Sequence, residues 1–433
     1  MKNFYTLLIL LFLIAMGISA QEVGPTYEPV VSHSTYFDVS QPLIDVNIPP
    51  RGGQYHHQHK NDPSIPKLNH ETVYKNLEGA LPKGVDPAWQ QVLGTRGLTP
   101  PLVNFQGVRN DDNGSSMVAP PDTDGDVGPN HYFQMCNTIF EIFDKSGNTL
   151  MGPSDNSTIW DGFIGDWTGT NDGDPIVLYD EQADRWLVSQ FAVDTDVTGG
   201  TYWVLVAIST TSNPLGSYYR YAFQYTSYPD YPKFGIWRDG YYLMVQHGNG
   251  TATASVLNRN QMLVGTSPAQ RVTFAIPNLP GSGFSSVLPA DNDGQWAPAG
   301  TPNYFVYFSD DAWGDDPVDR LKVWEFDVNW SSTGLSSLTL TQNLNTASFS
   351  SAFGSHNQGI IPQQGTIRKL AVMEKALMNR LQYRNFGSYE SMVCCHTVDV
   401  DGANRAGTRW YELRRTTGDW SISARHLRTR IYR

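Results

Sequence analysis

The sequence predicts an all-β protein with the architecture of a β-propeller, and three observations support this. From Pro101 onward, short aromatic and β-branched runs alternate with turns rich in Gly, Pro, Asn and Asp. A unit made of an acidic turn, an aromatic residue and a leucine recurs at 180–187 and 239–243, and more loosely at 144–150. Its uneven spacings fall around the ~40–50 residues of one four-stranded blade. A pair of β-sandwiches is the alternative architecture.

The first twenty residues read as a cleavable signal peptide. Lys2 is followed by an apolar run over 7–16, which is too short to span ~30 Å of hydrocarbon and ends in small residues up to Ala20. Residue 21 is Gln rather than Cys, so a lipid anchor is not indicated. We therefore expect a secreted protein that acts outside the cytoplasm, at the cell surface, in the medium or in a periplasm.

Residues 21–100 are expected to form a polar, poorly ordered leader or linker. This segment is rich in Pro, His and Asn, and its apolar runs are short and without a sustained period. His56, His57 and His59 lie close together, but no acid or cysteine accompanies them at ligand spacing. A solvated polar segment is the better interpretation of these histidines.

The domain predicted for residues 101–422 consists of short strands, which are separated by turns rich in Gly, Pro, Asn and Asp. The predicted strands are 139–143, 149–150, 176–179, 185–189, 202–208, 241–245, 304–308, 321–328 and 408–413. One segment, 367–384, has leucines and methionines near helical spacing, yet its second half alternates as a strand does. We therefore predict a strand in that second half.

Charge and cysteine content exclude several classes of protein. The chain has 42 acidic against 30 basic residues, so nucleic acid is not an expected partner. After the signal peptide no segment approaches ~18 consecutive apolar residues, so no membrane span is expected in the mature chain. Cys136, Cys394 and Cys395 are too few for a disulfide scaffold, and a bridge from Cys136 to either of the others cannot be read from the sequence.

Several segments resemble a family of exported bacterial β-propeller-like proteins of unassigned function. The family is marked by a P-P-D-T-x-G-D-V-G-P-N-H-Y segment, which is matched here at 120–132. Further matches are 173–180, 230–235, 288–294, 383–387 and 396–400. The resemblance covers roughly 104–422 and implies a secreted propeller-like domain without an assigned reaction.

The last eleven residues depart from this family. Relatives continue after the equivalent of 420–422 with more blade sequence, whereas 423–433 holds four arginines and no acid. We interpret 423–433 as an aberrant basic tail produced by a frameshift or truncation. On that hypothesis the propeller is incomplete and leaves strand edges unpaired.

A calcium site is predicted in the family segment. Asp122, Asp124 and Asp126 alternate beside Gly125, and oxygen-rich loops of this kind suit Ca²⁺. The loop is not an EF-hand, and the alternative is an acidic turn whose carboxylates accept backbone N–H groups. Residues 291–294 form a second, weaker candidate. No other cofactor is expected.

Candidate catalytic residues are numerous, but no catalytic motif is intact. Glycoside hydrolysis needs two carboxylates about 5–10 Å apart, or a tyrosine with an arginine cluster as in sialidases. The candidate acids are Asp174, Asp230, Glu325, Glu374, Glu390 and Glu412, and the sialidase-type candidates are Tyr218, Tyr219, Arg220, Arg380, Arg384 and Arg409. The sequence leaves the catalytic residues unassigned and does not decide whether the protein is an enzyme.

Aromatic residues favour a binding protein as the first functional hypothesis. Trp160, Trp167, Trp296 and Trp313 lie in loops rich in Gly and Asp, where flat rings stack on sugars or anchor proteins. They also suit blade packing. A secreted propeller that presents aromatic loops to a glycan or protein is therefore expected, and a glycosidase or sialidase-like enzyme is the alternative.

The centre of the propeller separates these two hypotheses. Two carboxylates facing each other across the axis, with an Arg or Tyr nearby, favour the enzyme. An axis filled by apolar side chains favours the binding protein. His247 and His396 lie at strand ends and are expected to be either packed or solvent-facing histidines without a special role.

Overall fold

The computed structural model describes residues 27–47, 84–90, 100–109, 112, 121–194, 200–247, 251–276, 279, 286–313, 316–353, 361–363, 365–367, 369–423 and 428–430. The predicted signal peptide and the histidines at 56–59 lie outside the described residues. No helix within the described ranges has the length and apolar character needed to cross a membrane.

The described chain forms a β-propeller of five blades, which confirms the predicted fold class. Three sheets supply one blade each, and a nine-stranded sheet supplies two. The first blade consists of β3 (Thr123–Val127), β4 (His131–Cys136), β5 (Ile139–Asp144) and β6 (Thr149–Asp155), and the second of β7 (Ile176–Asp180), β8 (Arg185–Asp194), β9 (Thr201–Ser209) and β10 (Tyr218–Tyr225). The third blade consists of β11 (Pro229–Ile236), β12 (Tyr241–His247), β13 (Ala252–Leu257) and β14 (Gln270–Ala275), and the fourth of β15 (Leu288–Asp293), β16 (Asn303–Ser309), β17 (Arg320–Asp327) and β18 (Ser337–Asn345). The fifth blade consists of β21 (Met378–Asn385), β22 (Glu390–Asp399), β23 (Ala406–Arg415) and β24 (Ser421–Ile422).

The remaining elements are short. They are the helical turns η1 (Leu43–Asp45), η4 (Asn156–Trp160), α3 (Arg259–Leu263), η5 (Asp311–Trp313) and η6 (Thr333–Leu335), and the two-stranded pair β19 (Ile361–Pro362) and β20 (Lys369–Leu370). The alternating second half of 367–384 is strand β21, as predicted.

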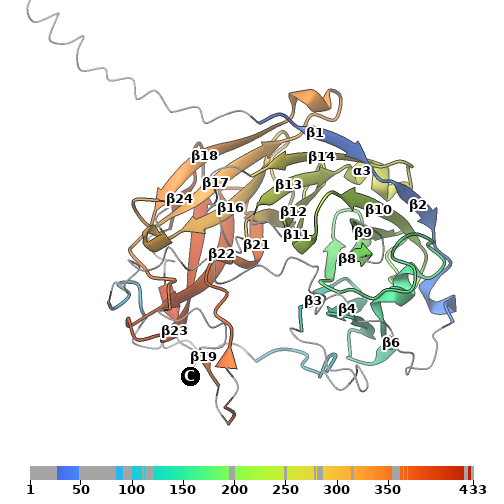
Figure 1. The fold of residues 1–433 in the computed structure, drawn as a ribbon, viewed down its shortest axis with the longest axis horizontal. Coiled ribbons are helices and arrows are strands. Elements are labelled where there is room, and N and C mark those ends of the chain that lie inside the picture. Colours follow the sequence, from blue (N-terminus) through green and yellow to red (C-terminus); the bar gives the residue numbers. More distant parts are fainter. Residues whose placement is uncertain are drawn as a thin grey trace, which may run out of the picture.

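The first strand of each blade lies at the centre. β7 contacts both β3 and β11, and β15 contacts both β11 and β21. Figure 1 shows the blades around a common centre in chain order, from β3 round to β23. β15 and β21 pair in parallel, with Ala290 opposite Leu381, so the fourth and fifth blades share one sheet. The start of each blade therefore brings its side chains toward one axis.

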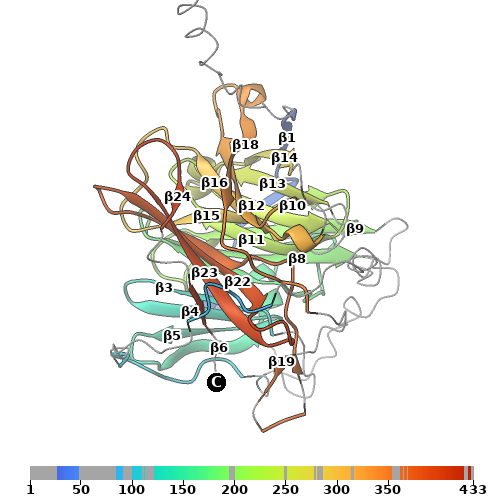
Figure 2. The same ribbon diagram turned by 90° about the vertical axis from the view of Figure 1, so that its left-hand side faces the viewer.

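Two strands that precede the propeller in sequence extend the second and third blades. β1 (Val30–His33) pairs with β14, and β2 (Tyr36–Val39) pairs with β10. Figures 1 and 2 both place β1 beside β14 at the rim. The prediction of a poorly ordered leader over 21–100 is therefore wrong for these residues. Each run is only 4 residues long, so it lacks the sustained period that the sequence argument required.

Aromatic side chains fill the spaces between blades. Trp186 on β8 packs against Phe133 and Tyr179, with ring centroids 5.9 and 4.9 Å away. Trp237 meets Tyr383 of the fifth blade at 4.6 Å. Such pairs hold neighbouring sheets face to face and contribute about 0.5–1.5 kcal/mol each beyond their buried area. The many aromatic residues of this sequence are therefore largely packing residues.

The last described residues complete the fifth blade. β25 (Arg428–Arg430) pairs with β23 beyond the end of β24, so two short strands together form the outer edge. The aberrant tail predicted over 423–433 was expected to leave strand edges of the propeller unpaired. For 428–430 this expectation is wrong, because these residues form a strand that pairs with β23. The frameshift hypothesis concerns the gene and stays a prediction.

A buried ion pair ties this tail to the leader. Arg409 on β23 donates to Asp86, and both side chains are 0% exposed. Thr429 Oγ1 donates to Asp86 Oδ2 at 2.6 Å, and Arg409 Nη1 donates to the Ala347 carbonyl at 2.7 Å. Because a buried charge is costly unless it is paired, these contacts fix 84–90 and 428–430 against the fifth blade.

All three cysteines are free thiols in the structure. Cys136 lies on β4 of the first blade, and its Sγ contacts Thr123 Oγ1 at 3.4 Å. Cys394 and Cys395 lie on β22, where Cys394 is buried and Cys395 is half-buried. Burial raises the pKa of all three thiols, so the thiolate form is disfavoured.

We expect Asp86→Ala to lower the free energy of unfolding by about 3–5 kcal/mol, because it leaves Arg409 buried without its partner. Chemical denaturation measures this. Arg414→Ala on the same strand is the control. That arginine is 40% exposed in its ion pair with Glu412, and exposed ion pairs contribute little, so its loss should cost much less. Equal effects of the two substitutions would contradict the assigned role of Asp86.

Candidate functional site

The innermost strand of the first blade turns two carboxylates toward its neighbour. Asp124 and Asp126 are two residues apart on β3 and therefore share one face of the strand. Asp124 Oδ2 accepts the Val177 N–H at 3.0 Å, and Asp126 Oδ2 accepts the Tyr179 N–H at 2.9 Å. The carboxylates thus satisfy backbone donors on β7, as in the acidic-turn alternative.

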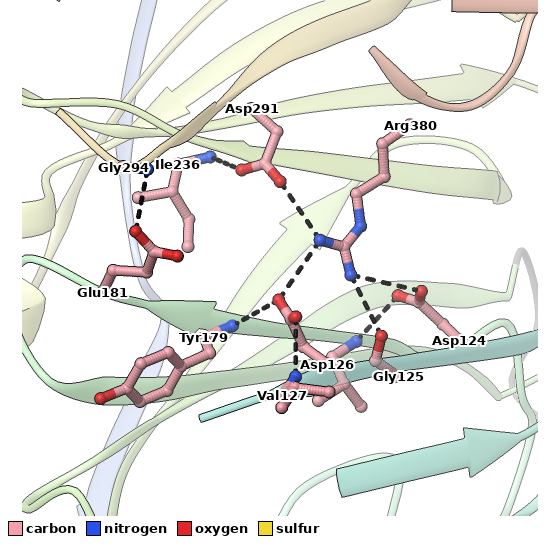
Figure 3. Close-up of polar contacts among 11 residues, drawn as sticks. Asp124, Gly125, Asp126, Val127, Tyr179, Glu181, Ile236, Asp291, Gly294 and Arg380 are labelled. Carbon is pink, nitrogen blue, oxygen red and sulfur yellow. Dashed lines mark hydrogen bonds and ion pairs between the residues drawn. The ribbon is translucent and has the colours of Figure 1, made fainter. Parts of the chain in front are cut away.

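The fourth blade repeats this arrangement. Asp291 on β15 accepts the Ile236 N–H of β11 through Oδ1 at 2.8 Å. Figure 3 shows Asp124, Asp126 and Asp291 directed toward one side chain, that of Arg380. Carboxylates from two blades therefore converge on the guanidinium of a third.

Arg380 on β21 makes these contacts from the fifth blade. Its Nη1 lies 3.2 Å from Asp126 Oδ2 and 3.4 Å from Asp291 Oδ2. Its Nη2 donates to the Gly125 carbonyl at 3.2 Å and lies 3.9 Å from Asp124 Oδ1. We call Arg380, Asp124, Asp126 and Asp291 the Arg380 cluster. No strand pairing joins β21 to β3 in the described chain, so these contacts link the last blade to the first.

Burial governs protonation in the Arg380 cluster. It raises the pKa of Asp291 to about 7, against the lowering effect of Arg380. The same cause raises the pKa of Asp124, again opposed by Arg380. Burial disfavours the guanidinium, but the surrounding carboxylates outweigh it and raise the pKa of Arg380. The arginine therefore stays charged while Asp291 titrates near neutrality.

A second cluster surrounds Lys233 of β11. The carboxylates of Asp174, Asp124, Asp122 and Asp230 all act on its ammonium group, and Nζ lies 3.8 Å from the centre of the Tyr231 ring. Burial lowers the pKa of Lys233 although these carboxylates oppose the shift. We call Lys233, Asp122, Asp174, Asp230 and Tyr231 the Lys233 cluster.

Unusual backbone conformations position the Lys233 cluster. Asp122, Asp174 and Tyr231 have φ of 39°, 48° and 52°, in the left-handed region that residues other than glycine seldom adopt. Each lies just before or within the innermost strand of its blade. Such conformations cost about 1–3 kcal/mol each and gather at functional sites. Three consecutive blades thus use the same local geometry to aim a polar side chain at the axis.

The turn between β7 and β8 contacts the end of β15 near the Arg380 cluster. Glu181 accepts the Gly294 N–H at 2.8 Å, and Gln182 donates to the Gly294 carbonyl at 2.8 Å. These bonds connect the second blade to the fourth, and Figure 3 shows the one from Gly294 to Glu181. Asp122, Asp230 and Tyr231 are half-buried, and so are Asp124, Asp126 and Arg380, so solvent reaches both clusters.

The calcium site predicted at Asp122, Asp124 and Asp126 stays a prediction. In the structure the cations that act on these carboxylates belong to the protein itself, namely Arg380 and Lys233. Another acidic group, Asp310, Asp311 and Asp319, lies close together elsewhere. Asp310 and Asp319 accept hydrogen bonds from the backbone there, so packing accounts for their position.

The other predicted acids are spread over the blades. Glu412 pairs with Arg414, and Glu374 is buried ahead of β21. Glu325 lies on β17, the third strand of its blade. Asp174 and Asp230 therefore reach the axis in a shared cluster, whereas these glutamates lie apart from it.

A tyrosine, a glutamate and an arginine do meet in the fifth blade. Tyr383 donates to Glu390, which also pairs with Arg415 at 2.8 Å. Tyr383 is 0% exposed and burial raises its pKa, so it is not an accessible nucleophile of the sialidase kind. Arg220 pairs with Asp38, Arg409 is buried with Asp86, and Arg384 is exposed, so the predicted arginines form no common cluster.

Two of the loop tryptophans are buried and a third packs near arginines. Trp160 and Trp167 are 5% and 3% exposed. Trp296 is half-buried, and the guanidinium carbons of Arg238 and Arg259 lie 5.7 and 5.2 Å from the centre of its ring. Trp313 ends η5, and its side chain is outside the described residues. The packing interpretation therefore holds for the first three.

Comparison with known proteins assigns no family. No protein-family model matches the chain, and no curated protein matches it in sequence. Solved structures with some likeness include an exo-β-1,3-galactanase from Phanerochaete chrysosporium, at 11% identity and a TM-score of 0.32, covering 72% of this chain and 64% of that one. An α-L-arabinofuranosidase from Clostridium thermocellum has 12% identity and a TM-score of 0.28, covering 72% and 94%. These values are too low to argue from.

We expect Arg380→Gln to lower the free energy of unfolding by about 2–4 kcal/mol, because it leaves carboxylates of two blades facing each other without a cation. Urea denaturation measures this. Arg384→Gln, four residues along the same strand, replaces an exposed arginine and should cost less than about 0.5 kcal/mol. If both variants were as stable as the parent, the Arg380 cluster would not hold the ring closed.

Asp291 should make stability depend on pH. Its folded pKa of about 7 lies above its ordinary value of 3.8, so the folded state binds more protons across this interval. The free energy of unfolding then falls as pH rises from about 4 to about 7. We expect Asp291→Asn to flatten this decline in denaturation series, and an unchanged slope would refute the assignment.

Asp144→Asn is the control for this series. Hydrogen bonds from Asn148 lower the pKa of Asp144, so its contribution is lost only as pH falls below about 4. That variant should leave the slope between pH 4 and pH 7 unchanged.

Proposed function

We propose that this protein is a secreted glycoside hydrolase whose catalytic carboxylates lie at the propeller axis. The observation that carries the proposal is that Asp122, Asp174 and Asp230, at the inner strands of three blades, all act electrostatically on Lys233. An enzyme of this kind requires carboxylates that face each other across the axis, with an arginine or a tyrosine nearby. Tyr231 and Arg380 supply those companions.

The chemistry required of such a site is limited. One carboxyl group must protonate the leaving oxygen while a second acts as base or nucleophile on the other side of the sugar. Asp122, Asp174 and Asp230, whose charges all act on the Lys233 ammonium, are the candidates for such a pair. The side chains of Lys233 and Arg380 supply positive charge that attracts the neighbouring carboxylates.

The binding hypothesis loses its main support. It rested on aromatic rings exposed in loops, and Trp160 and Trp167 are buried while Trp296 is half-buried next to Arg238 and Arg259. It also anticipated an axis filled by apolar side chains, whereas aspartates, a lysine and an arginine gather there. A polar axis with partly exposed carboxylates suits a reactive site better.

A panel of chromogenic glycosides, with natural oligosaccharides assayed by product chromatography, tests the proposal. We expect turnover of at least one substrate and a ~10²–10⁴-fold loss of kcat in Asp174→Asn or Asp230→Asn, because each removes a candidate acid or base. Added azide should restore cleavage of activated substrates in the variant that lacks the acid–base residue.

Asp144→Asn, at the end of β5 where Asp144 accepts the Ser146 N–H, is the matched control and should retain full activity. Glycan binding without turnover by the parent protein would instead support the binding hypothesis. Turnover that survives in both axial variants would place the catalytic residues elsewhere.

A further inference from the structure

A serine, a histidine and a threonine form a hydrogen-bonded series in the third blade. Ser227 Oγ lies 2.9 Å from Nδ1 of His247, and Nε2 of the same ring lies 3.1 Å from Thr253 Oγ1. Ser227 is in the loop between β10 and β11, His247 ends β12, and Thr253 is on β13. Three separate segments thus place a hydroxyl against a ring whose other nitrogen is also held.

The fold explains why these groups meet. His247 is paired across the sheet with Pro229, two residues after Ser227. Thr253 is paired with Val245, two residues before His247, so the threonine and histidine side chains lie on the same face of neighbouring strands. Strand register therefore fixes the imidazole between the serine and the threonine.

The neutral form of the ring fits the hydrogen bonds that it makes. A neutral imidazole accepts at one nitrogen and donates from the other. When Nδ1 accepts the Ser227 hydroxyl, the Nε2 proton is directed to Thr253. Burial lowers the pKa of His247 to about 4, so the ring is neutral at physiological pH and Nδ1 is free to accept the hydroxyl, although the same burial makes the ring a weaker base than free imidazole. The ring is 7% exposed, whereas Ser227 is half-buried and reached by solvent.

We propose that Ser227 is a nucleophile for carboxylic esters, with His247 as its base and Thr253 as the group that orients the ring. A nucleophile within hydrogen-bond reach of a base, which is in turn held by a third group, is the arrangement that activates a serine. This site is separate from the axial carboxylates and does not depend on the glycosidase proposal.

The reaction has a simple balance. Ser227 Oγ bonds to the ester carbonyl carbon while its proton moves to Nδ1 of His247, and the alkoxy group then leaves with that proton. Water attacks the acyl-serine by the same route, releasing the carboxylic acid and regenerating Ser227. The net reaction is an ester plus water giving an acid and an alcohol.

Aromatic rings lie near the histidine and next to the serine in sequence. The Tyr225 ring lies 6.1 Å from the His247 ring, and Tyr228 follows Ser227 directly, packed against Phe191 at 5.2 Å. Activated acetate esters, which place few demands on the acyl side of a site, are therefore the substrates chosen for the test.

Covalent labelling tests the proposal on the full-length protein. A fluorophosphonate reacts with activated serines, and intact-mass spectrometry with peptide mapping locates the adduct. We expect one adduct per chain at Ser227, its loss in Ser227→Ala, and a ~10²-fold or greater slowing in His247→Asn. Hydrolysis of p-nitrophenyl acetate should fall in parallel, and Thr253→Val should lower both rates less.

Ser217→Ala, a half-buried serine just before β10, is the matched control and should label like the parent protein. Thermal unfolding of each variant establishes that it is folded. No adduct on the parent protein, or an adduct that persists in folded Ser227→Ala, overturns the proposal. So does a labelling rate that is unchanged in folded His247→Asn, because that serine would then react without its base.

Discussion

The ion pairs of Arg380 are the interaction on which the arrangement of the propeller axis depends. The fourth and fifth blades share a sheet, but no strand pairing within the described residues joins the fifth blade to the first. Arg380 spans that junction and contacts Asp126 and Asp291 at the same nitrogen. Ion pairs, rather than backbone hydrogen bonds between strands, connect the two blades at this junction. The position of β3 relative to β21 therefore depends on the charges of Arg380 and its aspartate partners. The carboxylates of the first blade are therefore held in place by the same group that closes the ring.

The sequence predicted the strands better than it predicted how they meet. Aromatic and β-branched runs marked β5, β7, β8, β12 and β16, because a pleated, half-buried surface selects those residues locally. The strands β1 and β2 were missed, because four residues carry no period and their partners lie near 220 and 272, far along the chain. The acidic turn with an aromatic and a leucine correctly located the β7–β8 and β11–β12 hairpins, since turn chemistry is also local.

The sequence indicated most residues of the candidate site, but it did not indicate that they belong to one site. Asp122, Asp124, Asp126, Asp174, Asp230 and Arg380 all stood out as residue types, but as members of separate hypotheses about calcium, acid catalysis and sialidase-type binding. Only the ring brings them together, and sequence spacing carries no information about contacts between blades. Lys233 was missed as a site residue, although it lies between an aspartate-tyrosine pair and a buried strand. No special role was predicted for His247, because its partner Ser227 lies in the loop before β11 and the sequence does not show that the two residues meet.

The pairing of β1 with β14 bears on the way the chain acquires its structure. Val30 is among the first residues after the predicted signal peptide, and its partner Thr273 follows more than half the chain later. If the chain crosses a membrane unfolded, the earliest segment to emerge waits for a partner that arrives much later. Contacts of such high sequence separation slow folding and leave edges exposed meanwhile. The rim strands would then be the last part of the molecule to become ordered, and a holdase outside the cytoplasm would have most to shield there.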